Sequence, residues 1–286
     1  MANPYFDFAD EAGLQDENII HHRVKKYKGI QSTWIELKQD DQEKGKRKGN
    51  YISIETQDLD DKEQNRYFEQ AMQDILQRLL KKYHYTKKSR ILCVGLGNDA
   101  FLSDALGPKT MQKIQVTSHL VSRSIFSSFV SISSFRPGVM SSTGMETSHL
   151  IRAIQKEEKF DIIIVVDSLA TISLSRLYKV VQISDTGIHP GSGVANHRLP
   201  IDSKIMGCPV ICIGVATVVE SAALVFDTLN QIVPSQNISY QEIRQLLHEK
   251  ENNFVMTSKE IDRTIERLSS LLAHTLNAFF NPILLD

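Results

Sequence analysis

The sequence is poor in cysteine and close to neutral in charge. Its 286 residues include only Cys93, Cys208 and Cys212, and 33 basic against 34 acidic side chains give a net charge of −1. So few cysteines, in an odd number, argue against a disulfide framework and are typical of a reducing compartment. Neutralising phosphates takes clustered Lys and Arg, so the charge balance disfavours a direct nucleic-acid partner.

Long apolar runs are absent as well. The longest, residues 162–166 and 210–213, have the length of buried strands and fall short of the roughly 18 residues that cross a bilayer. The first residues, MANPYFDFADEAG, carry acidic side chains and lack the apolar segment of a signal peptide. We therefore expect a soluble, cytoplasmic protein with no membrane partner.

What the sequence does contain is the pattern of a single α/β domain. Hydrophobic residues make up 41% and charged residues 23%, which is ordinary for a globular protein with a real core. From residue 90 to 233, apolar strand-like runs alternate with helical patterns, which predicts a mostly parallel central sheet flanked by helices. Residues 161–167, DIIIVVD, show no alternation, as expected of a strand covered on both faces.

A hairpin is predicted ahead of this sheet. Residues 33–37 and 51–55 are rich in β-branched and aromatic side chains and form an N-terminal β extension. The connection between them is charged, and we interpret its KGKRKG stretch (44–49) as a solvated loop.

Helices are predicted from apolar spacing and from capping boxes. Apolar side chains at three- and four-residue intervals predict a helix over residues 62–83, and a further helix is expected over 218–233. The capping-box spacing predicts three more helix starts, two of them for C-terminal helices, at residues 143–146, 239–242 and 257–260.

The chemistry is expected in the loops that follow the strands. In open α/β sheets, sites gather beyond the carboxyl ends of the strands. Polar loops follow the strands at residues 90–96, 161–166 and 180–183, and we expect them to converge on one crevice. Gly95-Leu-Gly97 in the first loop lacks the third glycine of a dinucleotide site, so no cofactor is expected and these glycines are interpreted as a tight turn.

Two carboxylates stand out in these loops. Asp167 closes an apolar strand, and Asp104 precedes a helix that is expected to begin near Pro108. A lone Asp at a strand end often caps a turn or a helix, but two on one sheet edge favour chemistry. Two neighbouring carboxyls can share one proton, so that one is a base and the other an acid that activate water for amide hydrolysis.

A metal site is the weaker interpretation of the same region. His189, Asp185 and Glu146 could join Asp104 or Asp167 as ligands of Zn²⁺ or Ni²⁺. No HExxH motif or close His pair is present, so no bound metal is expected. His189 is interpreted instead as a hydrogen-bond donor that orients its loop.

At these residues the sequence resembles the germination protease family of spore-forming bacteria, which are atypical aspartic endopeptidases. The resemblance covers most of residues 90–280 in order, and its motifs are long and rarely shared. Within them, the two essential aspartates of the family fall on Asp104 and Asp167. The matching segments are VGLGNDAFLSDALGPK (94–109), FRPGVMSSTGMETS (135–148), DIIIVVDSLAT (161–171), QISDTGIHPGSGVANHR (182–198), GCPVICIGVATVVESA (207–222) and VMTSKEIDRTIERLSSLLAHTLNA (255–278), with KGKRKGNYISIET (44–56) ahead of them.

The resemblance implies an endopeptidase that degrades small acid-soluble spore proteins at germination, in the cytoplasm of the forespore and spore core. It implies a zymogen, a homotetramer, and a water molecule between Asp104 and Asp167. Lys109, Arg136 and His189 are then expected to contact the substrate or its oxyanion. Which aspartate is the base, and which substrates are cut, stay open.

The chain departs from the family pattern in two places. Residues 230–254 form a much shorter region than is usual, and the N-terminus is short. A more distant resemblance to hydrogenase-maturation endopeptidases, which share a similar fold, keeps a metal-dependent enzyme as an alternative. A catalytically silent sporulation protein is another alternative, although the presence of both aspartates argues against it.

The N-terminal residues resemble the family's own cleavage sites, Thr-Glu-(Phe or Ile)-Ala-Ser-Glu, which are cut after the first Glu. Asp7, Phe8, Ala9 and Glu11 take the acidic, apolar, small and second acidic positions. We therefore expect self-cleavage between Asp7 and Phe8, with residues 1–7 as propeptide and 8–286 as one peptidase domain. Mild acidification is expected to trigger it by supplying the shared proton.

Overall fold

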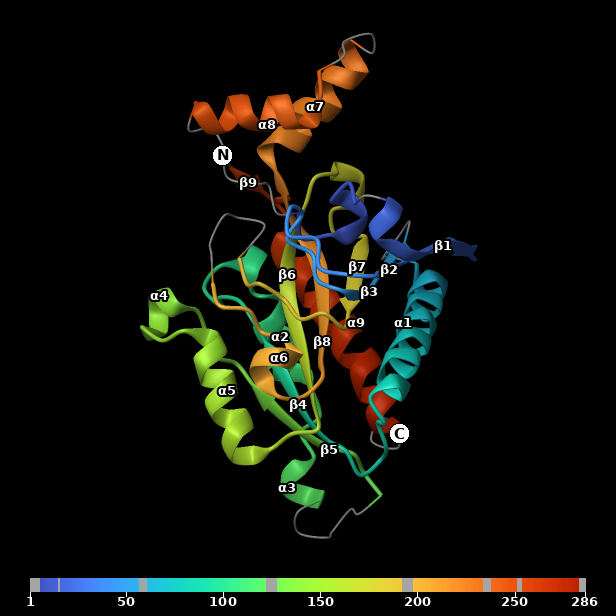
Figure 1. The fold of residues 1–286 in the computed structure, drawn as a ribbon, viewed down its shortest axis with the longest axis vertical. Coiled ribbons are helices and arrows are strands. Elements are labelled where there is room, and N and C mark those ends of the chain that lie inside the picture. Colours follow the sequence, from blue (N-terminus) through green and yellow to red (C-terminus); the bar gives the residue numbers. More distant parts are fainter. Residues whose placement is uncertain are drawn as a thin grey trace.

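The computed structural model in Figure 1 describes residues 6–14, 16–56, 61–121, 128–191, 198–233, 238–250 and 254–282. Within these ranges the strands form one sheet in the order β1-β2-β3-β7-β8-β6-β4-β5, with β9 paired to β8. The strands are β1 Ile19–Tyr27, β2 Ile30–Leu37, β3 Gly49–Thr56, β4 Arg90–Gly95, β5 Ser131–Phe135, β6 Ile162–Thr171, β7 Val180–Ser184, β8 Val210–Glu220 and β9 Val255–Met256.

The centre of the sheet is parallel, as predicted. Strands β5, β4, β6 and β8 run parallel to one another, while β7 runs antiparallel to β8 and joins it to the antiparallel β1-β2-β3 extension. Ile162 to Asp167 of β6 are all buried, which explains why this strand shows no alternation. The predicted hairpin at residues 33–37 and 51–55 is confirmed as β2 and β3.

Helices cover both faces of the sheet (Figure 1). One face packs on α1, α2 and α9, whose Leu76, Leu106 and Leu272 share a buried cluster with Ile164 of β6. The opposite face packs on α5 and α6. The helices are α1 Lys62–Lys82, α2 Leu106–Lys113, α3 Ser118–Val121, α4 Met140–Thr143, α5 Thr147–Glu158, α6 Ser203–Met206, α7 Ser221–Ile232, α8 Tyr240–Glu249 and α9 Ile261–Phe280.

Helices α7 and α8 lie beyond one end of the sheet rather than against a face (Figure 1). They follow β8, and Glu220 at its end accepts hydrogen bonds from Tyr240 Oη at 2.7 Å and Arg244 Nε at 2.7 Å. Among the described residues, no helix is both long and apolar enough to cross a membrane.

Some predicted boundaries were wrong. The boxes at 143–146 and 257–260 do not start helices: α5 and α9 begin after Glu146 and Glu260, and neither residue caps with its side chain. The box at Ser239 is confirmed, with both reciprocal hydrogen bonds. Strand β8 extends to Glu220, so the helix expected from 218 begins at Ser221.

Candidate active site

Asp167 lies in a row of three residues across the sheet. It pairs with Gly214 of β8, and Gly214 pairs with Gln182 of β7. Directly opposed residues in a sheet point to the same face, so Asp167 and Gln182 flank the side-chain-free Gly214, two strand spacings or about 10 Å apart. Asp167 is buried, and its Oδ1 accepts a hydrogen bond from Ser168 N at 2.8 Å.

Asp104 reaches the same place from the loop after β4. It ends a 3₁₀ turn, Leu102–Asp104 (η3), that leads into α2. Thr217 Oγ1 on β8 donates to Ser103 O at 2.7 Å, and Leu96 N donates to Val166 O at 2.9 Å, so the loop is tied to the ends of β8 and β6. Asp104 and Asp167 line one cavity of about 390 Å³. Residues 96–98, 167–170 and 188–191 line this cavity, so the three segments converge as expected, but residues 167–170 are part of β6 and not of a loop.

The two carboxyls differ in proton affinity. Burial raises the pKa of Asp104 to about 6. Burial, and next the charge of Asp104, raise the pKa of Asp167 well above its usual value. Asp104 is therefore ionised above about pH 6, and the surroundings of Asp167 favour its protonated form, so the pair is suited to supply one general base and one general acid.

A glycine sets the position of Asp104. Gly97 has φ +114°, and a Cβ built on it would lie 1.9 Å from Asp104 O and 3.0 Å from Asp104 Oδ1. We expect Gly97→Ala to push Asp104 out of place and to lower proteolysis about 100-fold, since a displacement of about 1 Å has that effect. The measurement is the rate of peptide cleavage at a temperature where the variant stays folded.

Gly207→Ala is the matched control for Gly97→Ala. Gly207 also has positive φ, +73°, but a Cβ there would meet nothing within 4 Å. It should therefore show the backbone strain alone and keep its activity. An active Gly97→Ala variant would mean that the loop does not need to hold Asp104 at this position.

The N-terminal segment lies on the same face as Asp167. Phe8 is fully buried in a cluster with Leu169, Val180 and Ala216, which come two residues along each strand from the row Asp167–Gly214–Gln182. Ala9 N donates to Gln182 Oε1 at 2.8 Å. The chain before Phe8 therefore passes over the row that contains Asp167.

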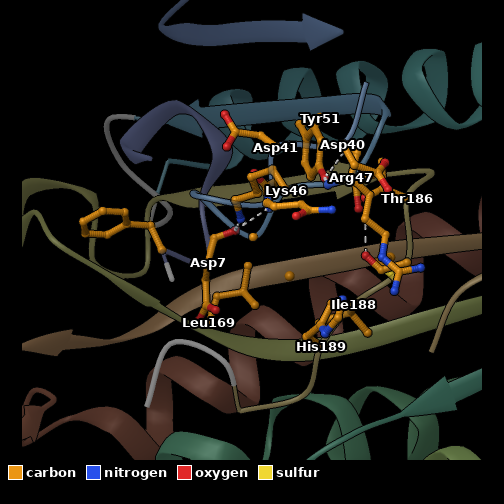
Figure 2. Close-up of a pocket in the computed structure, with 18 of the residues that line it drawn as sticks. Asp7, Asp40, Asp41, Lys46, Arg47, Tyr51, Leu169, Thr186, Ile188 and His189 are labelled. Atoms are coloured by element: carbon orange, nitrogen blue, oxygen red, sulfur yellow. Dashed lines mark hydrogen bonds between the residues drawn. The ribbon is translucent and has the colours of Figure 1, made fainter. Parts of the chain in front are cut away.

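Asp7 is held by three polar groups between two cavities. Its main-chain oxygen accepts hydrogen bonds from Lys46 Nζ at 2.7 Å and Gln182 Nε2 at 3.0 Å, and its Oδ2 accepts from Ala170 N at 2.8 Å. Figure 2 shows Lys46 pointing at Asp7 above Leu169. Asp7 lines the cavity of Asp104 and Asp167 and also a neighbouring cavity of about 340 Å³.

Arg176 binds the acidic residues that follow. Its Nη1 lies 2.7 Å from Glu11 Oε1 and its Nη2 lies 2.9 Å from Asp10 Oδ2. Glu11 also accepts hydrogen bonds from Thr171 Oγ1 at 2.5 Å and Ile172 N at 3.0 Å. The side chains of Arg176 and Glu11 are only 12% and 6% exposed, so this is a buried, hydrogen-bonded ion pair.

The chain is similar to known proteins over most of its length. The model of the germination protease family matches residues 7–242, from Asp7 through both aspartates. The chain belongs to the germination protease family. Germination proteases of Geobacillus sp. (strain WCH70) and Clostridium acetobutylicum are 35% and 33% identical to it, over 91% and 94% of this chain and 84% and 90% of theirs.

Membership in the germination protease family makes the chain a protease. A solved structure of a NiFe hydrogenase maturation protease, HycI from Thermococcus kodakarensis, is also similar, with 18% identity and a TM-score of 0.37. It covers 72% of this chain and 99% of its own.

The three residues expected to contact the substrate lie in different places in this member of the germination protease family. His189 lines both cavities, and burial lowers its pKa. Lys109 lines neither, and its Nζ lies 3.7 Å from Glu266 Oε2 on α9. Arg136 also lies outside both cavities, and its Nη1 lies 4.0 Å from Asp99 Oδ2 at the surface. Lys109 and Arg136 thus lie outside the two cavities, and their contact with the substrate stays a prediction.

Two of the alternative metal ligands, Glu146 and His189, line the same cavity as Asp104 and Asp167. Over the described ranges, no three His, Cys, Asp or Glu side chains are grouped as metal ligands. Asp185 is engaged elsewhere, by Asn50 Nδ2 at 2.9 Å and Lys82 Nζ at 2.9 Å. Burial raises the pKa of the Cys93, Cys208 and Cys212 thiols, which suits packing rather than metal binding or nucleophilic attack.

Sequence reasoning missed Lys46, Gln182 and Arg176. The interpretation of KGKRKG as a solvated loop was wrong for Lys46, whose side chain is buried and whose pKa burial lowers to about 8. A polar Gln182 inside the apolar run at 180–183 was the one available signal, because a buried amide needs partners.

Proposed function

We propose that this chain starts the breakdown of small acid-soluble, DNA-protecting spore proteins during germination, as an endopeptidase of the spore core. The observation that carries the proposal is the pair Asp104 and Asp167 in one cavity, with the pKa of each carboxyl raised by burial. Family membership supports the setting in germination.

In the proposed reaction a water molecule lies between the two carboxyls. Ionised Asp104 takes a proton from the water as its oxygen attacks the peptide carbonyl carbon. Protonated Asp167 polarises the carbonyl. The tetrahedral intermediate then breaks its C–N bond, one proton passes to the leaving nitrogen, and the products are a carboxylic acid and an amine.

We further propose that the chain is a zymogen with residues 1–7 as propeptide and 8–286 as the peptidase domain. The contacts of Asp7, Phe8 and Glu11 support this proposal, because they hold the segment with Asp7 at the wall of the cavity that Asp167 also lines. A tethered segment in the cleft has a high effective concentration and excludes other substrates.

We expect the purified chain to cut itself between Asp7 and Phe8, fastest at the pH where the two carboxyls share one proton and more slowly on either side. Below about pH 6 Asp104 becomes protonated and the base is lost. As the pH rises through the raised pKa of Asp167, that carboxyl loses the proton that the acid must hold. The expectation that mild acidification triggers self-cleavage stays a prediction, and the same pH series tests it. Mass spectrometry of the chain over time, at several pH values, gives the bond and the rates.

The same preparation tests the wider proposal. The processed enzyme should cut a small acid-soluble spore protein with and without a chelator of divalent metals. Intact substrate after long incubation would point to the catalytically silent alternative. Loss of cleavage on chelation, reversed by Zn²⁺ or Ni²⁺, would point to the metal-dependent one.

The homotetramer that the family resemblance implies is also a proposal for this chain. Exposed apolar side chains on α7 and α8, among them Ile232 and Leu246, offer a surface for association.

A further inference from the structure

The main-chain oxygen of Asp7 has an unusual pair of donors. It accepts one hydrogen bond from an ammonium, Lys46 Nζ at 2.7 Å, and one from an amide, Gln182 Nε2 at 3.0 Å. A peptide oxygen needs only one partner to be satisfied, and a buried ammonium is costly to place in a protein. Two donors on one carbonyl, at about 2.7–3.1 Å, have the geometry of an oxyanion hole.

Lys46 is fixed in this position by its own loop. Lys46 N donates to Asp41 O at 2.9 Å, and Asp41 N donates back to Lys46 O at 2.7 Å, which forms an isolated β-bridge across the β2–β3 connection. Lys44 N also donates to Asp41 Oδ1 at 3.0 Å. The connection is therefore ordered around Lys46, whose side chain enters the fold and ends at Asp7.

Gln182 is fixed by the sheet. It lies on β7 in the row Asp167–Gly214–Gln182, and its Oε1 accepts the hydrogen bond from Ala9 N at 2.8 Å. One amide group thus contacts the chain on both sides of the bond between Asp7 and Phe8. This arrangement holds Asp7 and Ala9, on either side of that bond, against a side chain of the row that contains Asp167.

We propose that Lys46 and Gln182 form the oxyanion hole for cleavage of the bond between Asp7 and Phe8. This inference rests on the proposed self-cleavage and assigns it two catalytic residues beyond the carboxyl pair. They take the role for which Lys109 and Arg136 were expected.

The step follows from the charges. Water attacks the Asp7 carbonyl carbon, and the carbonyl π pair moves onto the oxygen, where the Lys46 ammonium and the Gln182 amide stabilise the negative charge. The C–N bond then breaks as the carbonyl re-forms. With the oxygen held by these donors, the proton of Asp167 is available for the Phe8 nitrogen, which leaves as an amine, while Asp104 keeps the proton taken from water.

Lys46→Met tests this assignment, with Lys48→Met as its matched control. Methionine keeps the length of the side chain and removes the donor, and Lys48 is an exposed lysine of the same connection. We expect Lys46→Met to slow self-cleavage about 100-fold or more, as loss of one oxyanion donor does, and Lys48→Met to leave the rate unchanged. Mass spectrometry follows both, and far-ultraviolet circular dichroism checks the fold.

A second measurement separates catalysis from simple anchoring. Hydrogen exchange of the Ala9 amide reports whether the segment stays docked, and it is measured with Lys46→Met added to Asp167→Asn so that no chain is cut. Unchanged protection with slow cleavage supports the proposal. Lost protection, or a Lys46→Met variant that cuts itself at the unsubstituted rate, overturns it. If the unsubstituted chain is not cut after Asp7, the proposed zymogen itself fails.

Discussion

Asp104→Asn and Asp167→Asn are each expected to abolish proteolysis and self-cleavage while the fold persists. Asparagine has nearly the same shape as aspartic acid but can neither take the water proton nor hold the shared one. Loss of a general acid or base lowers rates by about 10²–10⁴-fold. The measurement is the fraction of chain cut after Asp7 over time, together with the cleavage of a spore-protein substrate.

Asp99→Asn is the control, because Asp99 lies in the same loop with its side chain 56% exposed. It should keep the unsubstituted rate. Cleavage by both Asp104→Asn and Asp167→Asn at that rate would remove the carboxyl pair from the mechanism.

Stability gives an independent readout of Asp167. Its pKa is raised in the folded state, so the unsubstituted chain loses stability as the pH rises from the unfolded value through the folded one. Asp167→Asn removes that loss, because asparagine carries no charge to bury. The variant should therefore melt at the same temperature as the unsubstituted chain or higher, with the difference growing toward alkaline pH.

Arg176→Met is expected to release the N-terminal segment. It leaves the buried Glu11 without its cation, and breaking a buried pair from one side lowers stability by about 3–5 kcal/mol. Burial already raises the pKa of Glu11, so protonation offsets part of that loss at acid pH. Self-cleavage should slow as the segment spends less time in the cleft. Denaturant unfolding and the rate of cleavage after Asp7 measure the two effects.

Arg90→Met is the matched control for Arg176→Met. Arg90 pairs with Glu158 at 2.8 Å, but the two side chains are 44% and 54% exposed. Exposed pairs contribute about 0–1 kcal/mol, so this variant should be nearly as stable as the unsubstituted chain and should cut itself normally. Equal effects from the two substitutions would mean that the Glu11 contact does not anchor the segment.

The sequence allowed the parallel core and the carboxyl pair to be predicted because both depend on local order. An aspartate after five aliphatic residues stands out in a covered strand, and Asp167 is such a residue, although β6 continues past it to Thr171. Asp104 follows a strand and a glycine turn in the same way. In both cases the family motifs fell on the same residues, so chemistry and resemblance agreed.

Other features depend on contacts between distant segments and could not be predicted. Lys46 acquires its role only when the β2–β3 connection meets Asp7, and Gln182 only when β3 joins β7 and β7 joins β8. Strand β1 is exposed along nearly its whole length, so no buried face imposed an apolar period on it. The helix starts predicted at residues 143 and 257 were wrong because the capping-box spacing also occurs away from helix starts. Thr143, for example, is the last residue of α4, and the next helix, α5, begins at Thr147.

The docked N-terminal segment bears on the kinetics of the proposed conversion from zymogen to processed enzyme. Because Phe8, Ala9 and Glu11 bind their own chain, each molecule would carry the bond that the proposed self-cleavage cuts, and the reaction would be unimolecular. Its half-time would not change on dilution, and no lag or self-accelerating phase would arise from finished molecules acting on unfinished ones. Each molecule would convert once, with a first-order rate. Under this proposal, the contacts of Lys46, Gln182 and Arg176 set the rate of self-cleavage, and the concentration of the protein in the compartment does not.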